Sequence, residues 1–267
     1  MINEWKGKWA LITGASAGIG VALAEELAAG GTHLLLTARR LDRLEEVAKS
    51  LEHKHRIQTK VFAADLAKRE APPQIFDFTR EKGLRIDLLI NNAGFGQYGE
   101  LHEVETQRLV DMVEVNCTAV VHLTRLFLPD MVARRSGDIL ILASTASFQA
   151  VPYISTYAAT KAFDLLFAEG LAEEMKPHGI RVCALCPGST ESEFHAVAQQ
   201  EQFTAKKQEP ADKVARTGLQ ALAAGKSYVI SGLGNYLGAH SPRGSCRAAW
   251  LRGSPETCSG PVSPANP

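Results

Sequence analysis

Residues 9–20 read WALITGASAGIG, and the order of these residues already indicates how the chain folds. The apolar run WALIT is typical of a buried strand, and glycines at G-x-x-x-G-x-G spacing lead from it into a helical pattern. Gly14 permits a tight turn, Gly18 a close approach of the backbone to a pyrophosphate, and Gly20 close packing of helix on strand. Because a helix amino terminus also favours phosphate, the stretch predicts a dinucleotide site. A glycine-rich turn of purely structural purpose is the alternative.

The same succession of strand and helix recurs along the chain. Short apolar runs occupy residues 9–13, 33–38, 59–64, 87–91, 138–144, 180–186 and 227–231. Helical patterns lie between them, at about residues 18–30, 41–53, 68–82, 105–133, 153–176 and 210–224. Near-continuous hydrophobicity in the strands and strict alternation predict an α/β fold, with a parallel sheet covered by helices on both faces. Ligands of such sheets lie beyond the carboxyl ends of the strands.

The composition points to small molecules, or further copies of the chain, as partners. With 267 residues and 45% hydrophobic content, the chain can form one large α/β domain or two small ones. Lys plus Arg and Asp plus Glu number 29 each, so no net field attracts nucleic acid or an anionic membrane surface. No apolar run reaches the roughly 18 residues of a membrane-spanning helix, and the amino terminus lacks a signal-peptide pattern. We therefore expect a cytoplasmic protein.

The five cysteines predict neither a disulfide framework nor a metal centre. Cys183 and Cys186 form a C-x-x-C motif, but they lie in the predicted strand 180–186, where positions three apart point to opposite faces. The histidines follow no H-E-x-x-H or Cys/His ligand pattern. We expect no metal, and a metal or redox role of the cysteine pair is the alternative.

The end of the second strand indicates which dinucleotide is bound. An NAD site usually places an acidic residue there to hold the ribose 2′-hydroxyl. Here the strand ends LLLTARR, with Ala38 at that position and Arg39 and Arg40 after it. Two guanidinium groups suit a 2′-phosphate, which favours NADP over NAD. The alternative is that both arginines are a solvated helix start.

Tyr157 and Lys161 lie four residues apart in a helical pattern that follows the strand 138–144. Residues at this spacing share a helix face. A phenol with a pKa of about 10 is a poor acid or base at neutral pH, but a nearby ammonium group favours the phenolate. Ser144 supplies a hydroxyl at the strand end that can hydrogen-bond a substrate carbonyl oxygen. The pair therefore predicts acid-base catalysis, and a surface neighbour pair is the alternative.

Taken together, these motifs resemble the short-chain dehydrogenase/reductase family. The similarity rests on TGASAGIG, Asp65-Leu66, NNAG at 91–94, Asn116, Ser144, Tyr157-x-x-x-Lys161 and Pro187-Gly188, and covers about residues 6–235. The stretches NNAGFGQYGEL and ARRLDRLEE are most similar to the bacterial branch of general oxidoreductases. One departure is Ala17, where the family usually has Ser.

The resemblance implies a single-domain Rossmann-type fold, with a doubly wound seven-stranded parallel sheet in a three-layer α/β/α arrangement. It implies NADP-dependent hydride transfer between a carbonyl and a secondary alcohol. Tyr157 would be the general acid or base, Ser144 would position the substrate oxygen, and Lys161 would lower the pKa of Tyr157 and bind the cofactor ribose. Asn116 would hold a water that links Lys161 to solvent, and a packed helical Asn is the alternative.

The resemblance also implies the contacts of NADP (NADPH). Asp65 would contact the adenine or act only as a helix cap, Asn91 and the NAG backbone would border the adenosine ribose, and Thr190 would meet the nicotinamide carboxamide. The full predicted set is Gly14, Ser16, Gly18, Ile19, Gly20, Arg39, Arg40, Asp65, Leu66, Asn92, Ala93, Gly94, Tyr157, Lys161, Pro187, Gly188 and Thr190.

Residues 1–240 are predicted to form the catalytic domain. The polar segment at about 189–210 is expected to be a substrate lid, with a solvated helix and loop as the alternative. From Ser241 the sequence becomes rich in Pro, Gly, Ser and Arg, which predicts a tail without fixed structure; an altered reading frame near His240 is a further hypothesis.

Aromatic residues near the predicted site favour an apolar substrate, and each could equally be ordinary packing. They are Phe95, Tyr98, Phe148, Tyr153 and Phe194. Family members usually form dimers or tetramers through the helices predicted at 105–133 and 153–176, so we expect a homodimer or homotetramer.

Two other functions compete with this interpretation. A non-catalytic NADP-binding module, for redox sensing or scaffolding, has no need of Ser144, Tyr157, Lys161 and Asn116 together. A sugar-nucleotide epimerase or dehydratase also uses Tyr-x-x-x-Lys, but needs a larger carboxyl-terminal domain.

Overall fold

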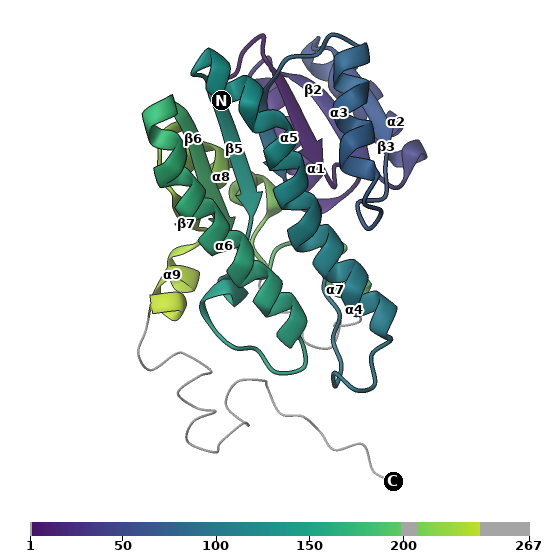
Figure 1. Cartoon of the computed structure of the whole chain (residues 1–267), viewed down its shortest axis with the longest axis vertical. Coiled ribbons are helices and arrows are strands. Elements are labelled where there is room, and N and C mark those ends of the chain that lie inside the picture. Colours follow the sequence, from purple (N-terminus) through teal and green to yellow (C-terminus); the bar gives the residue numbers. More distant parts are fainter. Residues whose placement is uncertain (1, 199–207, 241–267) are drawn as a thin grey trace.

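The strands form one parallel sheet in the order β3-β2-β1-β4-β5-β6-β7 (Figure 1). The computed structural model describes residues 2–198 and 208–240. The strand bounds are β1 Trp9–Thr13, β2 His33–Ala38, β3 Thr59–Ala63, β4 Ile86–Asn91, β5 Gly137–Leu142, β6 Ile180–Cys186 and β7 Tyr228–Ile230. The predicted doubly wound, seven-stranded Rossmann-type sheet is therefore confirmed.

Helices cover both faces of the sheet and give three layers. The helix bounds are α1 Gly18–Ala29, α2 Leu41–His55, α3 Ala71–Glu81, α4 Thr106–Val113, α5 Ala119–Arg134, α6 Ser155–Met175, α7 Phe194–Val197, α8 Ala211–Ala223 and α9 Leu233–His240. One buried apolar cluster joins the sheet to α1, α2 and α8, and a second joins it to α3, α5 and α6. These clusters are the two sides of the predicted core.

The strand order reverses between β1 and β4, which lie side by side in register Leu11 to Leu89. Chain segments that leave these two strands diverge to opposite sides, so a crevice opens beyond their carboxyl ends. The strands point toward the end of the molecule where α4, α7 and α9 lie (Figure 1). The predicted position of the ligand site is therefore at this end.

The predicted helix 105–133 is interrupted by a π-helical turn, Glu114–Thr118, between α4 and α5. Periodicity alone does not reveal such a turn, because one extra residue changes the hydrogen-bond pattern without changing the composition. The predicted helix 68–82 begins only at Ala71, where Pro72 and Pro73 occupy its first positions. The short helices α7 and α9 were not predicted.

The predicted lid is described in part. Residues 189–198 continue from β6 through α7, and Thr190 forms a parallel bridge with Glu209. Its middle, residues 199–207, and the predicted tail 241–267 lie outside the described residues.

Cys183 and Cys186 are buried in β6 and belong to the clusters on opposite faces of the sheet. This is the arrangement that the strand prediction required. Among residues 2–198 and 208–240, no group of histidine, cysteine and acidic side chains could hold a metal ion. Within the same ranges, every helix is too short or too polar to span a membrane.

Candidate active site

The glycine-rich turn is held by the end of β4. Asn92 donates from its side-chain nitrogen to the carbonyl oxygens of Thr13, at 2.8 Å, and Gly14, at 3.2 Å. The Thr13 hydroxyl in turn accepts from the backbone nitrogens of Asn92 and Ala93, both at 2.9 Å. Gly14 has φ +66°, and a Cβ there would lie 2.8 Å from the Asn92 amide nitrogen. Glycine is therefore required at this position both by conformation and by space.

Gly20 does not line the cavity, contrary to its place in the predicted cofactor set. A Cβ at this position would collide with the Gly14 carbonyl oxygen, so Gly20 allows α1 to pack on the turn. The amino terminus of α1 carries no capping side chain and no acidic residue in its first turn. Its backbone N–H groups and the positive end of its dipole thus suit a phosphate.

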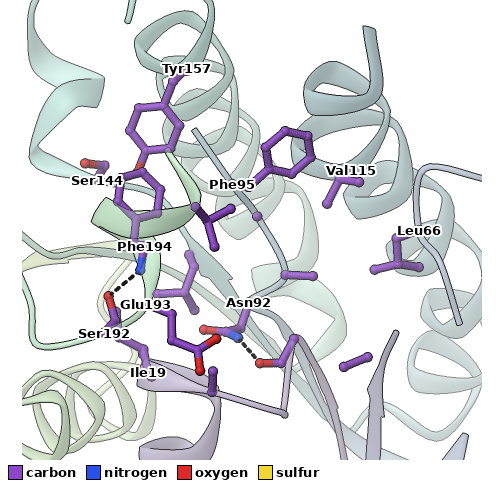
Figure 2. A pocket seen from close by; sticks show the side chains of 18 of the residues that line it. Ile19, Leu66, Asn92, Phe95, Val115, Ser144, Tyr157, Ser192, Glu193 and Phe194 are labelled. Carbon is purple, nitrogen blue, oxygen red and sulfur yellow. Dashed lines mark hydrogen bonds between the residues drawn. The ribbon is translucent and has the colours of Figure 1, made fainter. Parts of the chain in front are cut away.

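A cavity of about 530 Å³ extends from this turn to the ends of β5 and β6 (Figure 2). Apart from Gly20, Asn91 and Asn116, every predicted cofactor or catalytic residue lines it. They are Gly14, Ser16, Gly18, Ile19, Arg39, Arg40, Asp65, Leu66, Asn92, Ala93, Gly94, Ser144, Tyr157, Lys161, Pro187, Gly188 and Thr190. The fold therefore brings together residues that follow six strand ends, those of β1 to β6.

Arg39 and Arg40 border the cavity at the end of β2. Arg39 is exposed and has no ion-pair or hydrogen-bond partner in the described part of the chain. Arg40 donates to the Ser16 hydroxyl at 3.2 Å and to the Glu193 carboxylate at 2.9 Å. The Arg40 guanidinium thus lies beside the glycine-rich turn and Arg39 lines the same cavity, so both can offer a positive partner to a ribose phosphate.

Asp65 and Asn91 differ in their relation to the cavity. Asp65 lines it, while its carboxylate also accepts from the backbone nitrogen of Ala67 at 3.2 Å. Because α3 begins later, at Ala71, Asp65 stabilises a turn and does not cap that helix. Asn91 was expected to border the ribose, but its side chain is buried and donates to the Thr124 hydroxyl at 3.1 Å. That expectation was wrong for the side chain.

Ser144 is fixed where β5 ends. It caps the short 3₁₀ turn Thr145–Phe148 by accepting from Ala146 N at 3.1 Å, and its own N–H donates to the Ser147 hydroxyl at 3.3 Å. Ser147 donates to the carbonyl oxygen of Lys161 at 2.6 Å. This chain of contacts ties the strand end to α6, so the Ser144 hydroxyl and the α6 side chains keep a constant relation.

Tyr157 projects from α6 into the cavity and is covered by Phe194 (Figure 2), with ring centroids 5.1 Å apart. Both rings lie against Gly96, where a Cβ would be 2.8 Å from the Phe194 ring and 3.5 Å from the Tyr157 ring. Burial raises the pKa of the Tyr157 phenol above its ordinary value, and Lys161 and a hydrogen bond with Ser144 lower it in part. The predicted influence of Lys161 is present, but burial outweighs it in this structure.

Lys161 is buried beside Tyr157, with its ammonium nitrogen 6.0 Å from the phenol ring centroid. The ammonium donates to the Leu142 carbonyl oxygen at 2.6 Å and to the Asp164 carboxylate at 2.9 Å. Burial alone would lower the pKa of Lys161, but Asp164 raises it above its usual value. Asp164 was missed from the sequence, although its position three residues after Lys161 places it on the same helix face.

Asn116 lies in the π-helical turn and does not reach the cavity surface. Its side-chain oxygen accepts from Phe95 N at 3.1 Å, and its nitrogen donates to Phe95 O and to the Thr160 hydroxyl, both at 3.0 Å. The side chain thus joins the loop after β4 to α6. This is a packing role, and the predicted link through a water stays a prediction.

The predicted aromatic wall is only partly formed. Phe95 and Phe194 line the cavity, joined by Ile154 and Val197. The other three predicted residues do not line it. Tyr98 packs on Tyr153, with ring centroids 5.6 Å apart, and Phe148 packs near Tyr228 at 6.2 Å.

Three charged residues of the cavity, Arg108, Asp111 and Glu193, were not found from the sequence, and two of them make contacts that shape it. Glu193 belongs to the lid and pairs with Arg40 across the cavity mouth. Arg108 of α4 lies over the Phe95 ring at 4.2 Å and donates to Gln97 Oε1 and Val197 O. Neither residue has a local sequence signal, because its position depends on how distant loops fold.

A family model described as short chain dehydrogenase matches residues 8–202. The chain belongs to the short-chain dehydrogenase family. The fold of this family binds a nicotinamide cofactor, as the motifs predicted. The glycine-rich turn, Ser144, Tyr157 and Lys161 all lie within the matched range.

Relatives of this short-chain dehydrogenase include enzymes of different sizes. Very-long-chain 3-oxoacyl-CoA reductase-A of Danio rerio is 40% identical over 194 residues, or 70% of this chain and 59% of the relative. The chain thus spans about three fifths of the length of that relative. A short-chain dehydrogenase from Sphingobium yanoikuyae in complex with NADPH is 29% identical, with a TM-score of 0.80 over 97% of this chain and 98% of the other. The bulky-bulky ketone specific alcohol dehydrogenase from Comamonas testosteroni is 27% identical, with a TM-score of 0.76 and 97% coverage of both chains.

Proposed function

We propose that this short-chain dehydrogenase transfers hydride between NADP(H) and the carbonyl or secondary alcohol of a small, largely apolar substrate. The observation that carries the proposal is the common cavity. Ser144, Tyr157 and Lys161 line one end of it, and Arg39 and Arg40 line the other. One pocket therefore presents both an acid-base group and a site for the cofactor phosphates.

Tyr157 acts as the general acid or base in the proposed mechanism. Its phenol gives a proton to the substrate oxygen in reduction and takes one in oxidation. Ser144 donates a hydrogen bond to the same oxygen and stabilises the charge that develops on it. Lys161 supplies a fixed positive charge beside the phenol, which favours the phenolate form. When bound, the nicotinamide supplies or accepts the hydride.

The preference for NADP rests on the end of β2. Ala38 leaves no carboxylate for a ribose 2′-hydroxyl, and Arg39 and Arg40 offer two guanidinium groups in its place. A 2′-phosphate can accept several hydrogen bonds from such groups. The NADPH complex of the Sphingobium yanoikuyae relative is consistent with this preference.

The substrate class follows from the cavity wall. Phe95, Ile154 and Phe194 provide apolar surface near Tyr157, which suits a hydrophobic ketone, aldehyde or alcohol. The names of the Danio rerio and Comamonas testosteroni relatives indicate carbonyl compounds with large apolar groups. We infer the same broad class here.

Exposed apolar side chains on α5 and α6 bear on how the protein assembles. Val121 of α5 and Phe163 and Leu166 of α6 are exposed on the outer surface. Association through these helices would cover them, so we propose a homodimer or homotetramer. We also propose a cytoplasmic location.

The decisive experiment replaces Tyr157 by Phe. Carbonyl compounds are offered to purified protein with NADPH, and absorbance of the cofactor is followed. Tyr157→Phe should lower kcat by at least about a hundredfold while NADPH binding persists, since only the proton donor is removed. Tyr153→Phe is the matched control, because Tyr153 does not line the cavity and should leave turnover unchanged. Undiminished activity of Tyr157→Phe would refute the proposal.

A further inference from the structure

The buried ion pair behind the proposed acid points to a role for Asp164. An ammonium group has three donors, and Lys161 uses two of them on Leu142 O and Asp164 Oδ2. The cavity lies beside the same nitrogen, since a Cβ on Gly94 would be 3.3 Å from it. Two fixed acceptors therefore leave one donor to face the cofactor and substrate side.

The burial of the Asp164 carboxylate is energetically unfavourable. Its side chain is fully buried, and within the described residues its second oxygen, Oδ1, has no hydrogen-bond partner. Buried ion pairs often stabilise a protein less than apolar side chains of the same size, because both charges lose their hydration. A buried carboxylate with an unsatisfied oxygen is thus a poor device for stability alone. This cost suggests a function.

The charge of Asp164 opposes that of Lys161 where the Tyr157 phenol is ionised. Lys161 favours the phenolate and Asp164 disfavours it, while burial also disfavours it. Two thiols interact with the Lys161 charge, Cys117 from the π-helical turn and Cys186 from β6, and burial raises the pKa of each to about 12. They therefore stay neutral. The other charged groups that line the cavity are Arg39, Arg40, Asp65, Arg108, Asp111 and Glu193.

We propose that Asp164 is a positioning residue that fixes the Lys161 ammonium and offsets its charge, so that Tyr157 stays a protonated phenol up to higher pH. A protonated phenol is the form that carbonyl reduction requires, so Asp164 extends the reductive direction toward alkaline pH. This inference rests on the proposed function, in which Tyr157 is the proton donor.

The sign of the effect can be derived from the charges. Burial, with a smaller contribution from Asp164, raises the pKa of Tyr157, and the phenol is lost only as pH rises through that value. Removal of the Asp164 charge leaves the Lys161 ammonium unopposed, which lowers the pKa of Tyr157. The reductive rate should then decline at lower pH than in the wild type.

The test compares the wild type with Asp164→Asn, which keeps the shape and an acceptor for Lys161. The pH dependence of kcat/KM for carbonyl reduction is measured for both, and the alkaline limb should move to lower pH in the variant. Glu173→Gln is the matched control, because Glu173, near the end of α6, pairs with Lys176 three residues later and both side chains are exposed. Its profile should coincide with the wild type.

A second measurement does not depend on turnover. The phenolate absorbance of the full chain is titrated with pH in the wild type and Asp164→Asn, and Tyr157→Phe identifies the contribution of Tyr157. Ionisation of Tyr157 should occur at lower pH in Asp164→Asn. If the wild type reduces no carbonyl compound, the proposed function fails, and the titration still decides the role of Asp164.

Two results would overturn the inference. One is a lower kcat or stability of Asp164→Asn with an unmoved pH profile, which would make Asp164 a purely structural partner of Lys161. The other is an unmoved phenolate titration, which would show that Asp164 carries no charge that Tyr157 senses.

Discussion

Two ion pairs border the same cavity with the same separation but in opposite surroundings. Lys161 and Asp164 are 2.9 Å apart with side chains 6% and 1% exposed. Arg40 and Glu193 are also 2.9 Å apart, with side chains 43% and 53% exposed. The first pair lies on one helix at the back of the catalytic end, and the second joins the lid to the phosphate end. The distance between the charged atoms therefore does not distinguish the two pairs.

The surroundings make the two pairs behave differently. Water screens the exposed pair, so either partner can exchange the other for a ligand at little cost. Around the buried pair the effective dielectric constant is low, and neither partner can be removed without leaving an uncompensated charge. We infer that the chain keeps a permanent pair where the proton is handled and an exchangeable pair where the cofactor enters.

The largest effect is expected when one partner of the buried pair is removed. Asp164→Ala should lower the free energy of unfolding by about 3–5 kcal/mol, because Lys161 is left charged and buried. Urea denaturation of the full chain measures this change. Glu173→Ala, which breaks an exposed pair of the same sequence spacing at the end of α6, should cost less than about 1 kcal/mol. Equal losses in the two variants would remove the distinction.

A smaller effect is expected at the phosphate end. Joint replacement of Arg39 and Arg40 by Ala should weaken NADPH binding by about tenfold to a hundredfold, which corresponds to the net loss of one hydrogen bond to a charged group at about 1.5–3 kcal/mol. NADH lacks the 2′-phosphate and should bind almost as before. Titration of both cofactors by fluorescence measures the difference. A parallel loss for NADH and NADPH would contradict the preference for NADP.

The smallest effect on cofactor binding is expected when the exposed pair itself is changed. Glu193 and a 2′-phosphate would compete for the Arg40 guanidinium, so Glu193→Gln should tighten NADPH binding by no more than about fivefold. NADH binding should not change. The gain should shrink as salt is added, because exposed charges are screened. Weaker NADPH binding in this variant would mean that Glu193 assists the cofactor.

Sequence reasoning succeeded where a residue's place follows from the strand order. Ser144, Tyr157 and Lys161 line the same cavity as the glycine-rich turn, because parallel strands end at one edge of the sheet. The packing role predicted for Gly20 fits the structure, but its place among the cofactor contacts does not, because a glycine needed for packing belongs to the same motif as those that line the cavity. Asn91 and Asn92 show the same difficulty, since neighbouring residues point to opposite sides.

Other residues differ in how much signal the sequence carries. Asp164 could have been found, because an acid three residues after Lys161 must share its helix face. Glu193 could not, since its contact with Arg40 depends on the path of a loop. The pairing of Tyr98 with Tyr153 is likewise a loop contact, and for this reason the predicted aromatic wall was too large.

Phe194 gives the cavity a final property. Its ring packs against the Tyr157 ring, and both rings lie beside Gly96. We expect a substrate that reaches the Tyr157 hydroxyl to displace the Phe194 ring from it and to replace the apolar contact between the two rings. Substrates therefore compete with the Phe194 side chain for contact with Tyr157. Flat, apolar compounds should replace this contact better than strongly hydrated ones.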